Sequence, residues 1–163
     1  MNAPLRYNDR VYVAACNVGR GLFATRPFSP NEHILSFHGP RISTDDPLNQ
    51  SEQQSNLIQI GPREYVLPDP PGIFANHSCR PNAGLFQDTM LIAIAPIEKD
   101  EEIRFDYSTC MDEDNWTMPC ACGHPECRRL ITDFKTLSID QQAWFLERNL
   151  VQTFIAEQYI MGV

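Results

Sequence analysis

The chain has 163 residues and carries 13 basic and 21 acidic side chains, for a formal net charge of −8, together with six cysteines. Its length suits one domain with a hydrophobic core. The acidic balance argues against direct nucleic-acid binding, which needs clustered cations, and favours a lysine-bearing basic protein or peptide as partner. No apolar run approaches the roughly 20 residues of a membrane span, so no membrane association is expected.

The cysteines bear on compartment and chemistry. The first residues lack the apolar stretch of a secretory signal, which predicts an intracellular protein, cytoplasmic or nuclear, with reduced thiols. Metal binding is then favoured over disulfides. A redox regulator built on zinc and thiols is disfavoured, because no two cysteines have the C-x-x-C spacing.

The first hundred residues alternate between short strands and turns. Strands are predicted where apolar segments lie between Gly, Pro, Asn or Asp, at residues 11–15, 21–24, 33–37, 57–60, 65–67, 90–95 and 102–107. Gly61-Pro62 lies between two of these strands and predicts a hairpin. The polar stretch 43–56 is predicted to be a surface insertion with one helical turn.

Beyond Cys127 the pattern becomes helical. Ser138 followed by Gln141 is typical of a capping box at a helix start. Apolar side chains then recur at helical spacing, and Asn149 could end a first helix and start a second. The broad apolar face predicts packing on the domain or on a second copy of the chain.

Three cysteines form a C-x-C-x4-C cluster, namely Cys120, Cys122 and Cys127, and the glycine that follows the second permits a tight turn. Zinc prefers a tetrahedral shell of thiolates, and this spacing brings three of them within reach of one ion. Free thiols or a labile disulfide are the alternative. Cys79 is a candidate fourth ligand, although its position alone is equally compatible with a simple buried thiol.

Three further segments carry candidate chemistry. Residues 19–25 place two glycines around one residue, which allows a close backbone approach to a ligand or forms a plain turn. Residues 76–82 are rich in side-chain donors and acceptors, typical of a loop that bonds its own backbone or of a site. Residues 105–107 end a strand among many acidic side chains, which form either a solvated face or a surface that attracts lysine.

Taken in order, these segments resemble the SET-domain family of protein lysine methyltransferases with a zinc-binding post-SET segment. Residues 19–24 resemble the family's early glycine motif, and residues 76–82 match its N-H-S-C-x-P-N signature. Phe105-Asp106-Tyr107 matches the catalytic-tyrosine motif, and residues 120–127 match the post-SET cysteines. The match runs from about Arg10 to Arg128, most of the chain.

The resemblance implies a mainly β SET fold of small curved sheets with a C-terminal pseudoknot, in which the segment ending in Tyr107 passes beneath the Asn76-His77 loop. We therefore expect a SET catalytic domain over residues 8–108, a post-SET zinc segment over residues 109–130 and a helical extension over residues 131–163.

The resemblance also implies an activity, the transfer of methyl groups from S-adenosylmethionine to a lysine of a basic segment, histone-like or other. Tyr107 would be the catalytic residue. The residues implied to bind S-adenosylmethionine are Gly19, Arg20, Gly21, Leu22, Asn76, His77 and Tyr107. Phe105, Tyr65 and Trp116 would line the substrate channel. One structural Zn²⁺ per chain would be held by Cys79, Cys120, Cys122 and Cys127.

Some expectations remain open at this level. A catalytically idle SET fold that serves as a zinc-stabilised binding module is the alternative function. Residues 36–39 depart from the family's usual pattern and the insertion between Pro40 and Tyr65 is short, so the target is not implied. Phe105 beside the channel would leave room for di- or trimethylation. The chain could be a monomer or a homodimer through its C-terminal helices.

Overall fold

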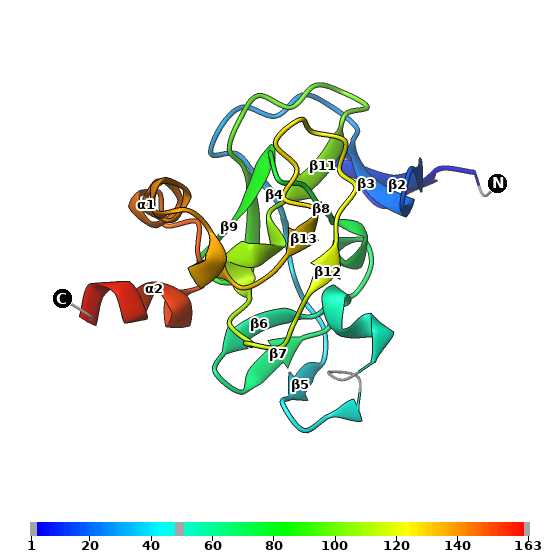
Figure 1. Ribbon diagram of the computed structural model, residues 1–163. Coiled ribbons are helices and arrows are strands. Elements are labelled where there is room, and N and C mark those ends of the chain that lie inside the picture. Colours follow the sequence, from blue (N-terminus) through cyan, green and yellow to red (C-terminus); the bar gives the residue numbers. More distant parts are fainter. Residues whose placement is uncertain (1–2, 48–50, 162–163) are drawn as a thin grey trace.

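The computed structural model describes residues 3–47 and 51–161 (Figure 1). The strands are β1 Leu5–Arg6, β2 Val11–Cys16, β3 Gly19–Ala24, β4 His33–Ser36, β5 Arg41–Ser43, β6 Ile58–Gly61, β7 Glu64–Val66, β8 Asn76–His77, β9 Ala83–Phe86, β10 Met90–Ala93, β11 Glu102–Phe105, β12 Met118–Pro119 and β13 Leu130–Ile131. The α-helices are α1 Ile139–Glu147 and α2 Thr153–Met161. The 3-10 turns within the described residues are η2 Glu52–Asn56, η3 Gly72–Phe74, η4 Tyr107–Cys110 and η5 Phe134–Thr136.

The strands form several small sheets, as expected for a mainly β protein. Their orders are β1-β2-β3-β11-β8, β4-β10-β9, β5-β7-β6 and β12-β13. The predicted hairpin is present as β6 and β7, which pair antiparallel. The predicted helical turn of the insertion is η2. None of the helices in the described part of the chain is long and apolar enough to cross a bilayer.

One pairing joins segments that are distant in sequence. β11 pairs antiparallel with β3 on one side and parallel with β8 on the other, with Arg104 opposite Asn76 and Phe105 opposite His77. The parallel pairing places the strand that leads to Tyr107 beside the Asn76-His77 segment. This is the junction that the SET fold requires.

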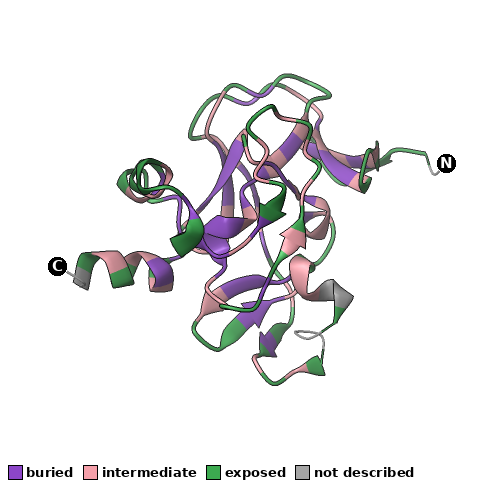
Figure 2. Cartoon of the chain, in the orientation of Figure 1, coloured by how far each residue is buried: buried purple, intermediate pink, exposed green. Residues whose placement is uncertain are grey.

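The main core lies between the sheets and explains the strand signals in the sequence. Leu22, Leu91 and Ile103 are fully buried in it. β11 alternates as predicted, because Ile103 and Phe105 face the core while Glu102 and Arg104 are half-buried. Figure 2 shows the buried residues gathered on the inner strands and the exposed ones along the outer loops.

The C-terminal helices pack on the domain itself. Ser138 caps α1 and forms the predicted capping box with Gln141. Asn149, with φ at +56°, lies in the left-handed turn between the two helices. A second apolar cluster joins the helices to Ile92 of β10, and its other buried members are Phe134, Leu137, Phe145, Leu150, Val151 and Ile155. Packing on a second copy of the chain stays a prediction.

Candidate functional site

The site is built around the turn that follows β11. The Asp106 side chain caps this turn by accepting the Ser108 N–H at 3.0 Å. The turn directs the Tyr107 hydroxyl at the Ala75 carbonyl, to which it donates at 2.7 Å, while the Tyr107 N–H donates to His77 Nδ1 at 3.0 Å. Tyr107 is therefore fixed at both its backbone and its hydroxyl by the segment around β8.

Two groups in this turn keep a single protonation state at neutral pH. Burial raises the pKa of the Tyr107 phenol well above its usual range, so the hydroxyl remains a hydrogen-bond donor. Burial lowers the pKa of His77 to about 4, so its ring is neutral. Because His77 Nδ1 accepts the Tyr107 N–H, the ring proton is assigned to Nε2, which lies 3.3 Å from Cys79 Sγ.

Two cavities meet at Tyr107. The larger has a volume of about 230 Å³ and is enclosed by the β2–β3 turn, β8, β11 and the cysteine-rich loop after β12. Its polar lining includes Asn76, His77, Glu102 and Arg104. Asn76 is itself held by hydrogen bonds from its amide to the Arg20 carbonyl at 2.9 Å and to Glu102 Oε1 at 3.1 Å. Mixed polar and apolar walls of this kind suit a small organic ligand with charged ends.

The second cavity is narrow and apolar. It holds about 10 Å³, scarcely room for one water, and is lined by Phe37, Phe105, Tyr107 and Trp116 among others. The ring centroids of Phe105 and Tyr107 lie 4.9 Å apart, and those of Phe37 and Phe105 lie 5.8 Å apart. Aromatic faces around a narrow passage suit an alkyl-ammonium group. Besides Tyr107, Ser55 and Asn56 of η2 line both cavities.

The glycine motif lies beside the larger cavity rather than in its wall. The residues that line the cavity here are the preceding turn, Cys16, Asn17 and Val18. Leu22 is fully buried in the core, and the Arg20 guanidinium lies over the Phe74 ring at 4.7 Å. The residue pattern did not predict that this turn lines the cavity, because a tight hairpin connection carries no chemical signature of its own.

A steric constraint nevertheless explains why position 21 is a glycine. A Cβ at this position would lie 2.5 Å from Glu102 Oε1 and 3.2 Å from Cys16 Sγ. The absence of a side chain therefore lets Glu102 and its partner Asn76 approach the strand, and this shapes the cavity indirectly.

The three expected channel residues occupy two different places. Phe105 and Trp116 line the narrow cavity, and Trp116 Nε1 donates to Ser55 Oγ at 3.3 Å. Tyr65 is fully buried in a separate small cluster with Ile42 and Leu57 and is not part of that lining. Tyr65 therefore lies outside the lining of the narrow cavity, and its role in the channel stays a prediction.

The four candidate metal ligands converge. One sulfur atom each from Cys79, Cys120, Cys122 and Cys127 lies within 4.8 Å of the other three. Gly123, with φ at +82°, makes the predicted tight turn between the second and third cysteines of the cluster. Three of the ligands belong to residues 117–130, which we call the cysteine segment, and the fourth follows β8.

The chemistry of this donor set fits zinc. Cys79 Sγ accepts the Arg128 N–H at 3.4 Å and lies beside His77 Nε2, and both contacts stabilise a thiolate. Burial would raise the pKa of Cys122, but hydrogen bonds from the backbone of Cys79 and His124 and from neighbouring thiols lower it to about 6. Burial raises the pKa of Cys79 and Cys120, so a bound cation is needed to keep these two as thiolates.

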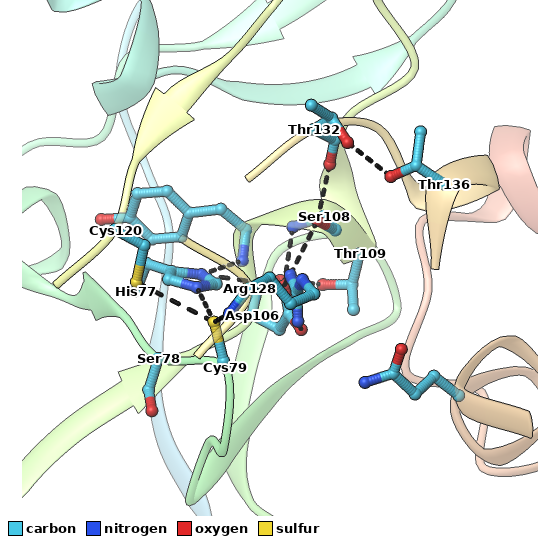
Figure 3. Close-up of polar contacts among 12 residues, drawn as sticks. His77, Ser78, Cys79, Asp106, Ser108, Thr109, Cys120, Arg128, Thr132 and Thr136 are labelled. Atoms are coloured by element: carbon cyan, nitrogen blue, oxygen red, sulfur yellow. Dashed lines mark hydrogen bonds and ion pairs between the residues drawn. The ribbon is translucent and has the colours of Figure 1, made fainter. Parts of the chain in front are cut away.

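An ion pair that sequence reasoning did not find links the cysteine segment to the tyrosine turn (Figure 3). Arg128 donates from Nη1 to Asp106 Oδ2 and from Nη2 to Asp106 Oδ1, each at 2.8 Å. The Asp106 side chain is 1% exposed and that of Arg128 20%. The only available signal was the position of Arg128 directly after the last cysteine, and this does not specify a partner 22 residues away.

Comparisons with known proteins agree with this geometry. A SET domain matches residues 19–108, more than half of the chain. The Drosophila melanogaster protein histone-lysine N-methyltransferase trr is 26% identical over 140 residues, which cover 76% of this chain and 6% of that protein. A histone-lysine N-methyltransferase from Eremothecium gossypii, H3 lysine-4 specific, is 27% identical over 128 residues, covering 66% of this chain and 13% of that protein.

A solved structure adds a likeness in fold. The crystal structure of a Plasmodium falciparum "putative histone methyltransferase" superposes with a TM-score of 0.50 at 26% sequence identity, and the match covers 62% of this chain and 95% of that one. The chain spans only a small fraction of the length of the curated relatives above.

Proposed function

The chain belongs to the SET-domain family, and we propose that it is a protein lysine N-methyltransferase that uses S-adenosylmethionine and acts on a basic, histone-like segment inside the cell. The observation that carries the proposal is the position of Tyr107, whose side chain lies where the larger polar cavity meets the narrow aromatic one. Relatives named as histone-lysine methyltransferases support this class of activity.

The two cavities fit the two substrates of such a reaction. The larger one offers Glu102, Arg104 and the Asn76 amide to the amino, carboxylate and ribose groups of S-adenosylmethionine. The narrow one offers the rings of Phe105, Tyr107 and Trp116 to a lysine side chain. The lining must part to admit this side chain, because the passage is almost closed.

The chemical demand on the protein is modest. S-adenosylmethionine supplies an electrophilic methyl group on a sulfonium, and transfer breaks one S–C bond and forms one N–C bond with a lysine that has already lost its proton. A lysine with a pKa of about 10.4 gives up that proton at pH 7 at a cost of about 4–5 kcal/mol. An apolar passage lowers this cost, because desolvation disfavours the ammonium.

Tyr107 supplies orientation in this scheme. Its raised pKa keeps the phenol protonated, so it acts through hydrogen bonding rather than as a base. The Ala75 carbonyl, its present acceptor, is placed to receive a polarised methyl or amine hydrogen in turn. Most of the rate is then expected from alignment of the amine with the methyl group.

The zinc site has a structural role in the proposal. The four cysteines would hold one Zn²⁺, and the ion would keep the cysteine segment over the larger cavity, which Met118, Cys120 and Cys122 help to line. Phe105 lies beside Tyr107 and carries no hydroxyl that could hold a water there, so we propose di- or trimethylated products.

The direct test is methyl transfer from labelled S-adenosylmethionine to a panel of basic proteins, with lysine as the acceptor confirmed by mass spectrometry. Tyr107→Phe should reduce kcat by about 100-fold or more, since about 2.7 kcal/mol is typical for losing one transition-state hydrogen bond. Tyr12→Phe is the matched control, because it also removes a hydroxyl hydrogen bond, to Asp100 at 2.9 Å, but on the surface.

The outcomes separate the two candidate functions. Transfer that collapses only in Tyr107→Phe supports the enzyme. Binding of S-adenosylmethionine without transfer to any acceptor would instead favour a catalytically idle, zinc-stabilised binding module.

A further inference from the structure

We propose that Arg128 is a positioning residue that makes the geometry of Tyr107 depend on the metal-bound state of the cysteine segment. This inference rests on the proposed function, since it assigns a role in the same site. It extends that function by naming the contact through which a structural zinc ion acts on the catalytic tyrosine.

The first link is the contact between Arg128 and the tyrosine turn. The guanidinium binds both oxygens of Asp106, the residue directly before Tyr107, and its Nη2 also donates to Ser108 Oγ at 3.1 Å, directly after it. One side chain therefore fixes both neighbours of Tyr107 (Figure 3). A bidentate arginine–carboxylate pair defines orientation as well as distance.

The second link ties Arg128 to the metal ligands. It follows Cys127 directly in the chain, and its own N–H donates to Cys79 Sγ at 3.4 Å. When the four sulfurs hold an ion, the backbone of Arg128 is held through its chain neighbour Cys127 and through its hydrogen bond to Cys79. When they do not, the cysteine segment loses its main constraint, because none of residues 117–130 is buried.

The third link explains why the tyrosine turn needs this partner. The Asp106 carboxylate is almost completely buried, and the Arg128 guanidinium binds both of its oxygens at 2.8 Å. A buried carboxylate that loses its arginine draws in water or reorients. Asp106 also caps η4, so its movement releases the N-terminus of the turn that holds Tyr107.

The residues after Tyr107 make further hydrogen bonds that hold the turn. Ser108 Oγ accepts from Arg128 and also donates to the Thr132 carbonyl at 2.6 Å, just after the cysteine segment. Thr109 Oγ1 and the Thr109 N–H both donate to the Asp106 carbonyl, at 2.7 Å and 3.1 Å. The turn is thus held together internally, and Arg128 is the side chain of the cysteine segment that anchors it.

The test compares Arg128→Lys with Arg129→Lys in the full chain. Lysine keeps the charge but cannot bind both carboxylate oxygens in one plane, so it removes orientation and retains neutralisation. Arg129 is the matched control, because it is the exposed neighbour in the same segment. Zinc content, S-adenosylmethionine affinity, kcat and hydrogen exchange of residues 105–111 are measured for each.

Arg128→Lys is expected to retain one zinc and to bind S-adenosylmethionine within about twofold of the parent, with kcat lowered about tenfold and exchange at residues 105–111 raised. A chelator should raise that exchange strongly in the parent and add little in Arg128→Lys, because both act through one contact. Arg129→Lys should match the parent in every measurement.

Parent-like kcat and exchange in Arg128→Lys would overturn the proposal, as would unchanged exchange at residues 105–111 after zinc removal from the parent. If Arg128→Lys does not fold, the pair Asp106→Asn with Arg128→Gln removes both charges, and parent-like exchange and kcat in that variant would equally overturn it. Should the parent transfer no methyl group, the proposed function fails, and the exchange measurements still decide the coupling.

Discussion

Two regions attach to the central sheets by opposite means. In the cysteine segment none of residues 117–130 is buried, and its contacts include the thiol cluster, the Arg128 ion pair, the short β12–β13 pairing and the partly buried Met118 against the core. The C-terminal helices attach through buried apolar side chains, among them Phe134, Phe145 and Ile155. Apolar burial contributes stability under any ionic condition, whereas a thiolate site depends on its metal.

The two regions meet at the tyrosine turn. Arg128 reaches it from the cysteine segment, and the Gln152 N–H reaches it from the helices by donating to the Thr109 carbonyl at 3.1 Å. Both regions therefore contact the turn, and under the proposal above only the contact from the cysteine segment depends on metal. This difference predicts that the helices set stability while the cysteine segment sets activity.

The largest expected effect is on the apolar side. Phe134 is fully buried between Phe145 and Tyr159, with ring centroids at 6.5 Å and 5.5 Å. Phe134→Ala should lower the free energy of unfolding by about 3–5 kcal/mol, through lost burial and a cavity. Denaturant titration measures this, and zinc content of the folded fraction should stay at one per chain. Loss of zinc without loss of stability would reverse the assignment of roles.

Gln152→Ala should have the next largest effect. The Gln152 side chain is fully buried, and its amide donates to the Gln59 carbonyl at 2.8 Å and the Asp88 carbonyl at 3.0 Å. Removing it leaves both carbonyls without that donor, so a loss of about 1–3 kcal/mol is expected. The backbone N–H of Gln152 supports η4 and is kept in this variant, so kcat of the folded protein should fall less than twofold. A tenfold fall in kcat of fully folded protein would show instead that both regions control Tyr107.

Ser138→Ala should cost about 1 kcal/mol, because it removes the side chain that caps α1. The cap lies at the far end of the helical region, so neither zinc retention nor affinity for S-adenosylmethionine should change. Thermal unfolding followed by circular dichroism provides the measurement. A change in ligand affinity would contradict the separation of the two regions.

Tyr65→Phe should have the smallest effect. Among the residues that the structure describes, the buried Tyr65 hydroxyl has no hydrogen-bond partner, so its removal should raise rather than lower the free energy of unfolding, by up to about 1 kcal/mol. Product distribution should also be unchanged, since the ring does not line the narrow cavity. A shift in the ratio of mono- to trimethylated lysine would restore the expected channel role of Tyr65.

The sequence predicted those features that leave a local pattern or a motif. The alternation in β11, the capping box at Ser138 and the grouping of Cys120, Cys122 and Cys127 follow from residue type and spacing, whereas Cys79 as the fourth member was expected only through the resemblance to the SET family. The two-residue strand β8 leaves no periodic signal, and its parallel pairing with β11 was expected only through the resemblance to the SET family.

Other features depend on the tertiary fold and could not be read locally. The ion pair of Asp106 and Arg128 is set by the packing of two loops, and no spacing rule specifies it. The cluster of Tyr65 with Ile42 and Leu57 could not be read from its short strand, because such a strand offers both faces to an aromatic side chain. The cofactor-sized cavity is lined by the turn at Cys16 rather than by Leu22, since burial of Leu22 in the core fixes which way β3 faces.

The central claim is that metal holds the segment that completes the active site, while the helices remain in place without it. Calorimetric titration of S-adenosylmethionine into zinc-loaded and chelator-treated protein tests this claim most directly. We predict affinity at least tenfold weaker after zinc removal, about 1.4 kcal/mol, with the far-ultraviolet signal of the helices unchanged. Loss of zinc with unchanged affinity would contradict the account.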